Sequence, residues 1–598
     1  MYGFHGRLLH IDLTTRTAQW VLLDHAVLRA YLGGVGLGTK LLFDYAPPAV
    51  DPFAPANPLI FASAPLVDTG LTTTAKFAVV TSSPLTNIIA DSLSSSYFAL
   101  ELKRCRLDAI VIVGSSSSPL SLFITEDDVM FHDATHLCGK SAQETERVLR
   151  SELHDENVRV AAIGLAGERR VRFATISNEK RHAGRGGAGA VMGAKNLKAI
   201  ALRGACRTPM ADPGGVAAIA DALRAKSLSS VTAKYREVGT IANLAVFNRL
   251  GVLPTRNFQQ STFESAENLS GEQFLLEETG NRPRGCAACT IRCERLFHAV
   301  DGRPQRLEYE TLFALGPLCG IEDSQTVLSA VQLCDEYGLD TISTGGTVAW
   351  AMECAEKNLL PRAQRLGLRF GKAEAFLATI TAIGQRSGLG ALLAEGSRAA
   401  AATIGGEAEL LAMHVKGMEL PGYEPRSLKT MALGLAVSLR GACHNRSGAY
   451  EADFSGQVDR FRADPGRGPL VAASEDFSAV LDSLVVCKFL RKCFTDFYAE
   501  SAEVLSKVTG WSVTAAELQQ VGERINTLKK LFNLRQGWQP PDDWLPSRLL
   551  SEPLPTGVGQ GVELTATELR VMIAGYYKAR GWDENGYVPR EKQEALGL

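Results

Sequence analysis

In the first two hundred residues, apolar positions come in short runs that are separated by turn residues. The runs are GRLLHIDL (6–13), NPLIFASAPL (57–66), KFAVVTSS (76–83), LDAIVIVG (107–114), LSLFITED (120–127), VRVAAIGLAG (158–167) and VRFATISN (171–178). Short apolar, β-rich runs of this kind are typical of strands. Residues 26–46 and 141–154 instead repeat apolar positions every three or four residues, which predicts helices. The N-terminal third is therefore predicted to be β-rich, with a few helices between its strands.

The pattern changes after about residue 210. Helical periodicity dominates in 214–228, 324–339 and 380–404, and a further helical region begins near residue 416 and ends in a polar tail. A chain of 598 residues is too long for one core, and it contains no short repeat and no low-complexity linker. We therefore predict an α+β fold of three packed domains: a β-rich domain (1–210) and two mainly helical domains (211–415 and 416–598).

Composition narrows the class of protein. Apolar residues make up 45% of the chain and charged residues 21%, and the formal net charge is -2 with no long block of one sign. Nucleic acid or an anionic membrane surface is therefore not expected as the main partner. No apolar run is long enough to span a bilayer, and the N-terminal residues resemble neither a signal peptide nor a twin-arginine leader. A cytoplasmic location is expected.

Three of the 12 cysteines form a C-x2-C-x3-C run, Cys286, Cys289 and Cys293. So few cysteines in so long a chain do not indicate a disulfide scaffold. The spacing differs from the paired C-x2-C knuckles of a zinc ribbon, and it favours an iron–sulfur cluster over zinc or a chance group of buried thiols. The fourth ligand must be distant in sequence. Cys487 and Cys493 are both candidates, and spacing does not choose between them.

A glycine-rich segment, RHAGRGGAGAVMGAKNLKAI, spans residues 181–200. It is not a G-x4-G-K-[ST] phosphate loop, because Ala194 precedes Lys195. Its glycines would let the backbone lie against a large planar or anionic ligand, and Arg181 and Arg185 could bind phosphate through planar guanidinium groups. A flexible turn without any ligand is the alternative.

Two heptapeptides share a pattern, DEYGLDT (335–341) and DSLVVCK (482–488). One such segment alone is a common helix end, closed by a residue such as Gly338. Two related copies in the two helical regions indicate two similar ligand-binding halves. Glu310 and His444 each stand in an apolar segment, where a satisfied buried polar group is the alternative to a functional one. From these residues alone, the chain is interpreted as an iron–sulfur protein and an enzyme.

Taken together and in this order, the segments resemble the aldehyde:ferredoxin oxidoreductase family, the tungsten bis-pterin enzymes. The resemblance runs through nearly the whole chain and is carried by GRLLHIDL, YLGGVGLGTKLL, SPLT, RHAGRGGAGAVMGAKNLKAI, CAACTIRC, EYETL, CDEYGLDTIS, RGACH and LDSLVVCKF. It implies a tungsten centre held by two pterins (molybdenum being the alternative metal), one [4Fe–4S] cluster, and Mg²⁺ that bridges the pterin phosphates. It also implies that the β-rich domain cradles the pterins.

The resemblance assigns roles to individual residues. It makes Cys487 the fourth cluster ligand beside Cys286, Cys289 and Cys293, and gives Cys493 no counterpart role. It places Glu310 and His444 beside the tungsten. The cofactor-binding positions that it implies are Lys76, Leu93, Ser95, Arg181, His182, Gly184, Arg185, Asp335, Leu339, Asp340, Arg440, Gly441, Arg446, Asp482, Cys487 and Lys488.

Several positions depart from the family pattern. Lys76 replaces an arginine between cluster and pterin, which keeps the charge but loses the bidentate fork. Leu93 stands at an asparagine position, and Val485 replaces the glycine of the second heptapeptide. Ser329 and Gln332 stand where an iron-binding E-x-x-H pair would begin. The iron-bridged dimer of some archaeal members is therefore not expected.

The implied activity is oxidation of an aldehyde to a carboxylic acid. Glu310 would be the general base toward water, and His444 would donate to the carbonyl oxygen. Electrons would leave through the cluster to a ferredoxin or an iron–sulfur subunit, with any NAD reduction on a separate flavin- or NAD-binding subunit of a multi-subunit complex. One alternative is a low-potential aromatic thioester reductase of the benzoyl-CoA type, in which Cys319 could touch the metal. Another is a non-catalytic iron–sulfur electron-transfer subunit.

Overall fold

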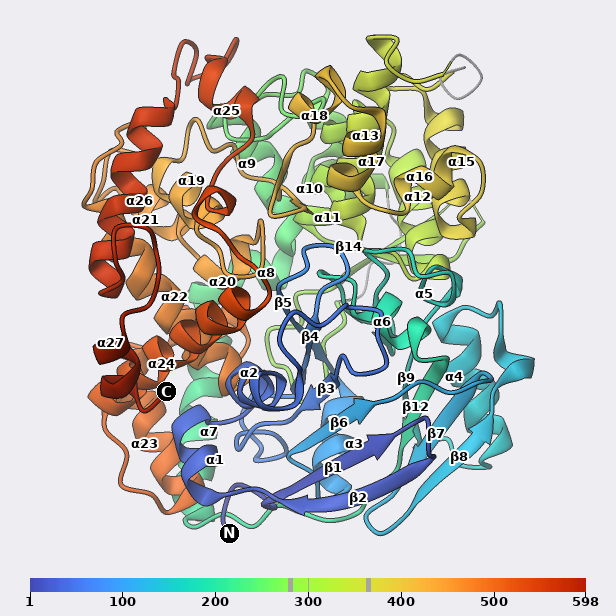
Figure 1. Ribbon diagram of the computed structural model, residues 1–598, viewed down its shortest axis with the longest axis vertical. Helices are drawn as coiled ribbons and strands as arrows, with labels where there is room; N and C mark the ends of the chain where they lie inside the picture. Colours follow the sequence, from blue (N-terminus) through green and yellow to red (C-terminus); the bar gives the residue numbers. More distant parts are fainter. Residues whose placement is uncertain (278–282, 300, 362–366) are drawn as a thin grey trace.

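Two six-stranded sheets form the N-terminal part of the chain, in a computed structural model that describes residues 1–277, 283–299, 301–361 and 367–598 (Figure 1). The first sheet has the order β2-β1-β6-β3-β4-β5. Its strands are β1 (Arg7–Asp12), β2 (Thr17–Leu22), β3 (Leu59–Ala62), β4 (Lys76–Ser82), β5 (Ile89–Ser95) and β6 (Ala109–Val113). Within it, only β1 and β6 pair in parallel.

The second sheet has the order β11-β10-β9-β12-β7-β8. Its strands are β7 (Leu120–Ile124), β8 (Val129–Asp133), β9 (Arg159–Ala162), β10 (Ile176–Asn178), β11 (Arg181–Ala183) and β12 (Leu197–Leu202). Here only β7 and β12 pair in parallel. The β-rich N-terminal region and the mainly helical remainder confirm the predicted α+β class.

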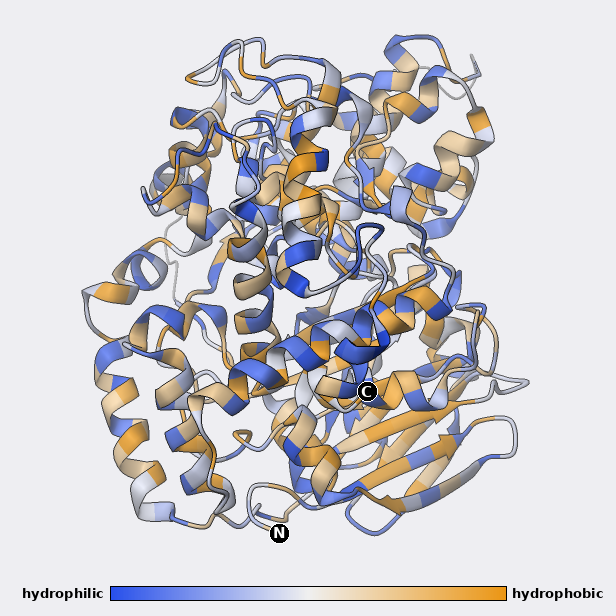
Figure 2. Cartoon of the chain, turned by 60° about the vertical axis from the view of Figure 1, so that its left-hand side comes forward, coloured by the Kyte–Doolittle hydropathy of each residue, from blue (hydrophilic) through white to orange (hydrophobic). Residues whose placement is uncertain are grey.

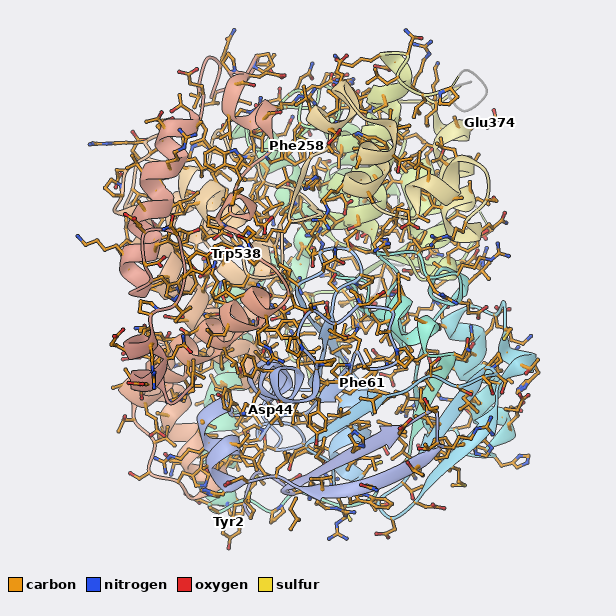
Figure 3. All side chains as sticks on the ribbon, in the orientation of Figure 1. Tyr2, Asp44, Phe61, Phe258, Glu374 and Trp538 are labelled. Atoms are coloured by element: carbon orange, nitrogen blue, oxygen red, sulfur yellow. The ribbon has the colours of Figure 1, made fainter. Side chains whose placement is uncertain are left out.

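Apolar side chains of the first sheet are buried on both of its faces, and the strands in Figure 2 are accordingly mostly hydrophobic. On one face, Phe61 and Phe77 pack with Phe98 of helix α3 (Tyr97–Arg104), and the Phe77 and Phe98 ring centroids are 4.8 Å apart. Helix α2 (Gly34–Tyr45) covers the other face. Figure 3 shows Phe61 in the interior, whereas Tyr2 and Glu374 lie at the periphery. Burial on both faces explains why several strands read as continuous apolar runs.

Three N-terminal predictions differ from the structure in detail. The predicted strand over 158–167 is a strand only over β9, and helix α5 (Leu165–Glu168) begins within it. The predicted helix over 26–46 is two helices, α1 (His25–Tyr31) and α2, because Leu32 adopts a left-handed φ of 62°. The predicted strand over 171–178 forms a strand only from residue 176, since the Ala174 amide donates to the Val171 carbonyl in a turn.

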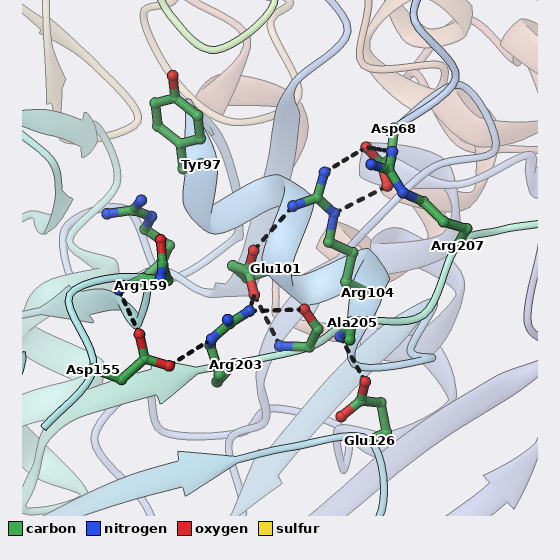
Figure 4. Close-up of polar contacts among 12 residues, drawn as sticks. Asp68, Tyr97, Glu101, Arg104, Glu126, Asp155, Arg159, Arg203, Ala205 and Arg207 are labelled. Atoms are coloured by element: carbon green, nitrogen blue, oxygen red, sulfur yellow. Dashed lines mark hydrogen bonds and ion pairs between the residues drawn. The ribbon is translucent and has the colours of Figure 1, made fainter. Parts of the chain in front are cut away.

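Charged side chains fasten the segment after β12 to α3 and to the loop before β4 (Figure 4). Arg104 binds Asp68 at 2.9 Å and Glu101 at 3.2 Å, and Arg207 also reaches Asp68. Arg203 binds Asp155 at 2.7 Å. The contacts tie the start of the helical part to the first sheet.

The remaining chain is mainly helical. Its helices include α7 (Pro213–Ser227), α8 (Ala233–Glu237), α11 (Tyr309–Leu315), α12 (Ser324–Tyr337), α13 (Thr341–Glu356), α15 (Ala373–Gln385), α20 (His444–Ser447), α22 (Arg467–Ser483), α24 (Ala515–Arg535) and α26 (Ala566–Arg580). The largest cluster of buried apolar side chains draws on residues from Leu85 to Val588. The division at 210 and 415 stays a prediction. Within the described residues, no helix combines the length and the apolar character needed to cross a membrane.

Candidate active site

The two heptapeptides have the same backbone geometry, each at the C-terminal end of a helix. After α12, the Leu339 amide donates to the Cys334 carbonyl at 2.8 Å, and after α22 the Val486 amide donates to the Leu481 carbonyl at 3.0 Å. In both, the residue before the donor is left-handed, with φ of 78° at Gly338 and 53° at Val485. A hydrogen bond of this type across a left-handed residue is a common way for a helix to end.

Val485 adopts this conformation although a β-branched side chain is strained there.

Backbone from the N-terminal region also lies very close to each heptapeptide. A Cβ on Gly164 would lie 2.4 Å from the Tyr337 carbonyl, and one on Gly34 would lie 2.5 Å from the Asp482 carbonyl. Glycine is therefore required at both positions. The YLGGVG and GLAG segments pack their backbone against the two heptapeptides.

The aspartates of the heptapeptides are held by basic side chains. Asp340 caps the N-terminus of α13 and accepts from Arg185 Nε at 3.3 Å, while Asp482 accepts from Arg446 at 2.6 Å. Asp335 lies 3.1 Å from His182 Nε2. The glycine-rich segment and the RGACH loop therefore meet the two heptapeptides, although 150 or more residues separate Arg185 from Asp340 in the sequence.

The glycine-rich segment itself forms β11, a short turn and helix α6 (Ala188–Ala194). Arg181 forms an ion pair with Glu294, and His182 Nδ1 lies 2.7 Å from Ser177 Oγ. Nothing lies within 4 Å of a Cβ built on Gly184. The backbone at Gly184 is thus open to a ligand.

A buried carboxylate that the sequence analysis did not single out organises the other side of the site. Asp91 on β5 binds Arg440 at 3.2 Å, Arg446 at 2.9 Å and Lys529 at 2.5 Å. Burial would raise the pKa of Asp91, but these three cations hold it well below its usual range. Lys529 comes from α24. In the sequence, the pair Lys529–Lys530 within an otherwise apolar stretch is the feature that could have indicated a buried cation here.

Glu310 on α11 and His444 on α20 lie close together. Their two apolar segments, far apart in the sequence, gave no indication of this. Glu310 Oε1 lies 3.4 Å from His444 Nδ1, and Glu310 Oε2 accepts from the Gly422 amide at 3.0 Å. Burial raises the pKa of Glu310 to about 8. Burial, together with the charges of Lys488 and Arg185, lowers the pKa of His444 well below 6.5. At neutral pH the proton therefore belongs on the carboxyl group rather than on the imidazole.

Aromatic rings line one side of this pair. His444 stacks on Tyr423 with ring centroids 5.3 Å apart, and Tyr450 stacks on Tyr423 at 4.7 Å. Tyr309 packs edge-on against Tyr423 and donates its hydroxyl to the Gly422 carbonyl. The same glycine thus holds Glu310 through its amide and Tyr309 through its carbonyl, which fixes the carboxylate against the aromatic wall.

Four cysteines gather at a second place. Cys286, Cys289, Cys293 and Cys487 are all partly exposed. Burial raises the pKa of Cys289 to about 11, and the neighbouring charge of Cys487 adds to the effect. Burial raises the pKa of Cys493, although the charge of Lys226 opposes this, and no other thiol is among the causes. Cys487, and not Cys493, is thus the cysteine that the tertiary structure brings to the run.

No group of three or more His, Cys, Asp or Glu side chains in the described part of the chain lies close enough to hold a single metal ion. A cluster places each thiolate on a different iron, so its ligands stand farther apart than those of one zinc.

Three predicted residues lie between the cysteines and the heptapeptides. Ser95 Oγ is 3.2 Å from Cys286 Sγ, and Leu93 packs in a small apolar cluster with Val485 and Ala287. Burial opposes the charge of Lys76, but Cys487, Cys286 and Asp482 outweigh it and raise its pKa. The charges of Cys286, Cys487 and Asp482 all act on Lys76, so one cation lies by the cysteines and the second heptapeptide.

The remaining predicted residues lie in the same region. Leu339 and Asp340 are buried, and Gly441 has φ of 98°. Burial lowers the pKa of Lys488 to about 8, although Asp482 favours its charge. Cys319, by contrast, is buried with its thiol directed to the Ala314 and Gly345 carbonyls, both at 3.4 Å.

The polar groups of the site fit a large polar ligand. Four of the buried polar atoms that lack a hydrogen-bond partner in the described structure lie here: Arg440 Nε, and Glu310 Oε1, His182 Nε2 and His444 Nδ1, which have only the ion-pair contacts given above. Such atoms are costly unless a ligand or water satisfies them. With the open backbone at Gly184 and the surrounding guanidinium groups, the donor set fits an anionic, hydrogen-bonding cofactor such as a phosphate-bearing pterin.

Comparisons with known proteins cover the chain almost completely. Residues 8–204 match the N-terminal domain of aldehyde ferredoxin oxidoreductase, and residues 218–598 match its domains 2 and 3. The chain is 38% identical to the tungsten-containing aldehyde ferredoxin oxidoreductases of Pyrococcus abyssi and Pyrococcus furiosus, with 100% of the chain and 99% of each relative covered.

Two further likenesses are more distant. The chain is 31% identical to the WOR-like subunit of an aliphatic sulfonate oxidoreductase of Pyrococcus furiosus, covering 100% of the chain and 97% of that protein. It also resembles a solved structure, the active site complex BamBC of benzoyl coenzyme A reductase in complex with 1,5-dienoyl-CoA. The TM-score is 0.84 at 26% identity, covering 100% of this chain and 97% of that one.

Proposed function

Because the chain belongs to the aldehyde ferredoxin oxidoreductase family and is an oxidoreductase, we propose that it oxidises aldehydes to carboxylic acids at a tungsten centre held by two pterins. The bound centre would supply Lewis-acid and two-electron acceptor chemistry. The observation that carries the proposal is the Glu310–His444 pair, in which a carboxyl with a raised pKa faces a neutral imidazole at 3.4 Å.

Glu310 and His444 would have different roles in proton transfer. Ionised Glu310 takes a proton from the attacking water at Oε1. His444 donates to the aldehyde oxygen as negative charge develops, and its Nδ1 lies 3.4 Å from Glu310. The aromatic wall of Tyr423 and Tyr450 packs His444 in this orientation and keeps water from its face.

The cofactors are assigned to residues of the same site. Cys286, Cys289, Cys293 and Cys487 would hold a [4Fe–4S] cluster, and Lys76 would link it to the second pterin. The glycine-rich segment would hold Mg²⁺ together with the pterin phosphates. The proposed pterin contacts are Leu93, Ser95, Arg181, His182, Gly184, Arg185, Asp335, Leu339, Asp340, Arg440, Gly441, Arg446, Asp482, Cys487 and Lys488.

The proposal is tested with Glu310→Gln, which keeps the size of the side chain but removes the base. The variant should retain tungsten, pterin and iron and yet lose at least about a hundredfold in aldehyde oxidation per tungsten. Glu353→Gln is the matched control, because Glu353 is also a buried carboxylate but binds Arg548 and Asn257 away from the site. The control should lose stability and keep its activity per tungsten.

His444→Asn should lose activity in the same way, and most for poorly activated aromatic aldehydes if the imidazole polarises the carbonyl. If both residues were only buried structural groups, the variants would instead be poor in cofactor, and their remaining holoprotein would turn over normally. Near-wild-type activity per tungsten in both variants would end the catalytic assignment.

A second candidate function is reduction of an aromatic thioester, which the likeness to the benzoyl coenzyme A reductase complex favours. That function would be supported if Cys319 bound the metal. Since the Cys319 thiol is directed to two backbone carbonyls, we expect Cys319→Ser to keep its tungsten and its aldehyde oxidation. Loss of tungsten from this variant would favour the reductase. Iron without tungsten, molybdenum or pterin in the native protein would favour a non-catalytic electron-transfer subunit.

A further inference from the structure

Strand β2 is the outermost strand of the first sheet, at the lower edge of the molecule in Figure 1. Within the part of the chain that the structure describes, β2 pairs only with β1, so its other edge has no neighbouring strand. Large apolar side chains are exposed on it: Trp20 and Val21 each keep 37% of their surface, and Leu22 keeps 85%. An exposed apolar edge strand is a ready template for pairing with a strand of another chain.

Strand β2 lacks the features by which edge strands usually avoid such pairing. Its sequence, TAQWVL, contains no charged residue, proline or glycine, and its register with β1 runs without a shift from Thr17 to Leu22. The edge strand β8 of the second sheet, by contrast, ends in the exposed side chains of His132 and Asp133. Charged side chains, prolines and bulges are the usual protection of a free edge, so β2 is open to a partner strand.

The hydrogen bonds to β1 determine which backbone groups of β2 face the open edge. The Leu23 amide donates to the Gly6 carbonyl at 2.9 Å, and hydrogen-bonded pairs alternate with non-bonded pairs along an antiparallel ladder. In the register of β1 with β2, the residues that bond to β1 are therefore 17, 19, 21 and 23. The backbone N–H and C=O groups of Ala18, Trp20 and Leu22 point to the open edge.

A second copy of β2 fits this edge in one antiparallel register. Only the register that places Trp20 opposite Trp20 of the second copy brings all three outward-facing residues into hydrogen-bonded pairs, with Ala18 opposite Leu22 on both sides. Any slide along the strand leaves at least one of the three without a strand residue opposite it. The pairing has a two-fold axis at Trp20, as an interface between identical surfaces requires.

The same register brings complementary charges together at both ends of the pair. It places Arg16, in the turn before β2, opposite Asp24 of the second copy, which follows the end of β2. Both side chains are exposed, and neither forms an ion pair with another described residue. One oxygen of Asp24 caps α1 by accepting from the Ala26 amide, which leaves the other oxygen for a cation. The neighbouring His25 packs edge-on against Trp511 instead.

The side chains beside the edge fit this arrangement. On β1, the Arg7 guanidinium lies over the Trp20 ring, 5.5 Å from its centroid, and Asp12 accepts from two backbone amides of the following turn. Because side chains alternate between the faces of a strand, Ala18, Trp20 and Leu22 share one face. The second copy would continue this face with the same three residues, and cross-strand aromatic pairs stabilise a sheet.

We propose that β2 is the interface of a homodimer, in which the β2 strands of two copies pair in antiparallel and join the two first sheets into one. Strands β2 and β5 are opposite edges of the first sheet, so Asp91, Leu93 and Ser95 on β5 lie away from the interface. Each copy therefore keeps its own candidate active site, and the inference does not depend on the proposed function. The interface needs no bridging metal, which distinguishes it from an iron-bridged dimer.

The charges are tested by sedimentation of the purified holoprotein over a dilution series. The wild type should sediment as a dimer that dissociates on dilution. Arg16→Glu and Asp24→Lys each put like charges opposite one another at both ends of the pair, so each should raise the dissociation constant of the dimer at least about tenfold. An equimolar mixture of the two variants should dimerise like the wild type, because the changed residue of each then faces an opposite charge on the other.

The backbone pairing is tested at Leu22. Leu22→Pro removes an N–H that points to the open edge and none that bonds to β1, so the variant should fold, as prolines on edge strands allow. It should raise the dissociation constant at least about tenfold, because hydrogen bonds between the copies are lost. Leu22→Ala is the matched control, since it keeps the N–H and removes a side chain that is 85% exposed, and it should raise the dissociation constant much less.

Lys578, which is exposed on α26, provides a control for net charge. Lys578→Glu should keep the wild-type dimer, and an equal loss in this variant would attribute the effect to total charge and overturn the proposal. A wild type that is monomeric throughout, a mixture of the two folded charge variants that stays monomeric, or equal losses from Leu22→Pro and Leu22→Ala would overturn it too. If Asp24→Lys unfolds because Asp24 caps α1, Arg16→Glu and Leu22→Pro decide, and a wild-type dimer in either overturns the proposal.

Discussion

At the scale of single residues, burial acts in opposite directions on the two members of the Glu310–His444 pair. It penalises whichever form is charged, so it raises the pKa of the carboxyl and lowers that of the imidazole. With their ordinary pKa values, the proton would reside on His444 rather than on Glu310. With the shifted values, it resides on Glu310. The resulting proton on Glu310 must leave before the residue can act as a base, which makes the pair sensitive to pH near neutrality.

The pH profile should show this requirement. The pKa of Glu310 is about 8 instead of 4.5, so the ionised base becomes more abundant as the pH rises, and kcat/KM for aldehyde should increase up to about pH 8. The stability effect has the opposite sign, because the folded protein holds this proton more tightly than the unfolded chain. The stability that this proton contributes is complete below pH 4.5 and is lost as the pH rises through 8, by at most about 1.4 kcal/mol per pH unit.

Glu310→Gln is the control for both effects. Its residual activity should not rise with pH in this range, and its melting temperature relative to the wild type should improve between pH 6 and 8. A wild-type profile that is flat over this range would contradict the assignment of Glu310 as the base.

The cysteines give a second prediction at the residue scale. Cys289→Ser and Cys487→Ser should lose iron and visible absorbance, because a hydroxyl is a poor ligand for a cluster that selects thiolate. Cys493→Ser should keep both, since its thiol is buried in an apolar cluster and is influenced by no other thiol. Iron content and absorption spectra measure this. Iron loss from the Cys493 variant with retention in the Cys487 variant would reverse the choice of fourth ligand.

At the scale of elements, the repeated helix end is the main feature of the site. In both heptapeptides, a left-handed residue turns the chain sharply, so that the aspartate before it and the residues after it line the same region. The sequence predicts this turn at Gly338 but not at Val485, because valine is a poor residue for it. The backbone contact from Gly34 and the burial of Val485 in a small apolar cluster hold the strained turn.

Substitution by glycine should reveal the strain at Val485. Val485→Gly and Val486→Gly each remove a buried valine side chain, but only Val485 has a positive φ. The Val485 variant should therefore be less destabilised than the Val486 variant by about 1–2 kcal/mol, the strain that glycine relieves. Urea unfolding of the two holoproteins measures the difference. An equal loss in both would show that the turn at Val485 stores no strain.

At the scale of the whole molecule, the site lies where the N-terminal sheets meet the helical part. Strand β5 contributes Asp91, Leu93 and Ser95, the glycine-rich segment contributes Arg185, and the helices contribute the heptapeptides and the Glu310–His444 pair. The four cysteines, which are all partly exposed, lie at a second place in the molecule. Under the proposed function, electrons would leave through these cysteines, and the sequence carries no nucleotide-binding fingerprint.

Partner dependence is the prediction at this scale. The purified holoprotein should reduce a one-electron dye with aldehyde but should not reduce NAD, because the motifs for a nicotinamide or flavin site are lacking in the sequence. Absorbance at the wavelengths of the reduced dye and of NADH measures both reactions. Addition of an electron-transfer partner that carries flavin should restore NAD reduction. Robust NAD reduction by the chain alone would contradict this.

The sequence by itself determined the mixed α+β class, because strand and helix periodicity are local properties of the chain, and it located the cysteine run, the glycine-rich segment and both heptapeptides. The pattern of residues could not choose between Cys487 and Cys493; only the family resemblance did so before the structure. Nor could the pattern show that Glu310 faces His444, or find Asp91 and Lys529, which are 438 residues apart. Contacts of this kind depend on how distant elements pack, and packing also fixes burial. The shifted pKa values and the left-handed turn at Val485 were therefore decided only by the tertiary structure.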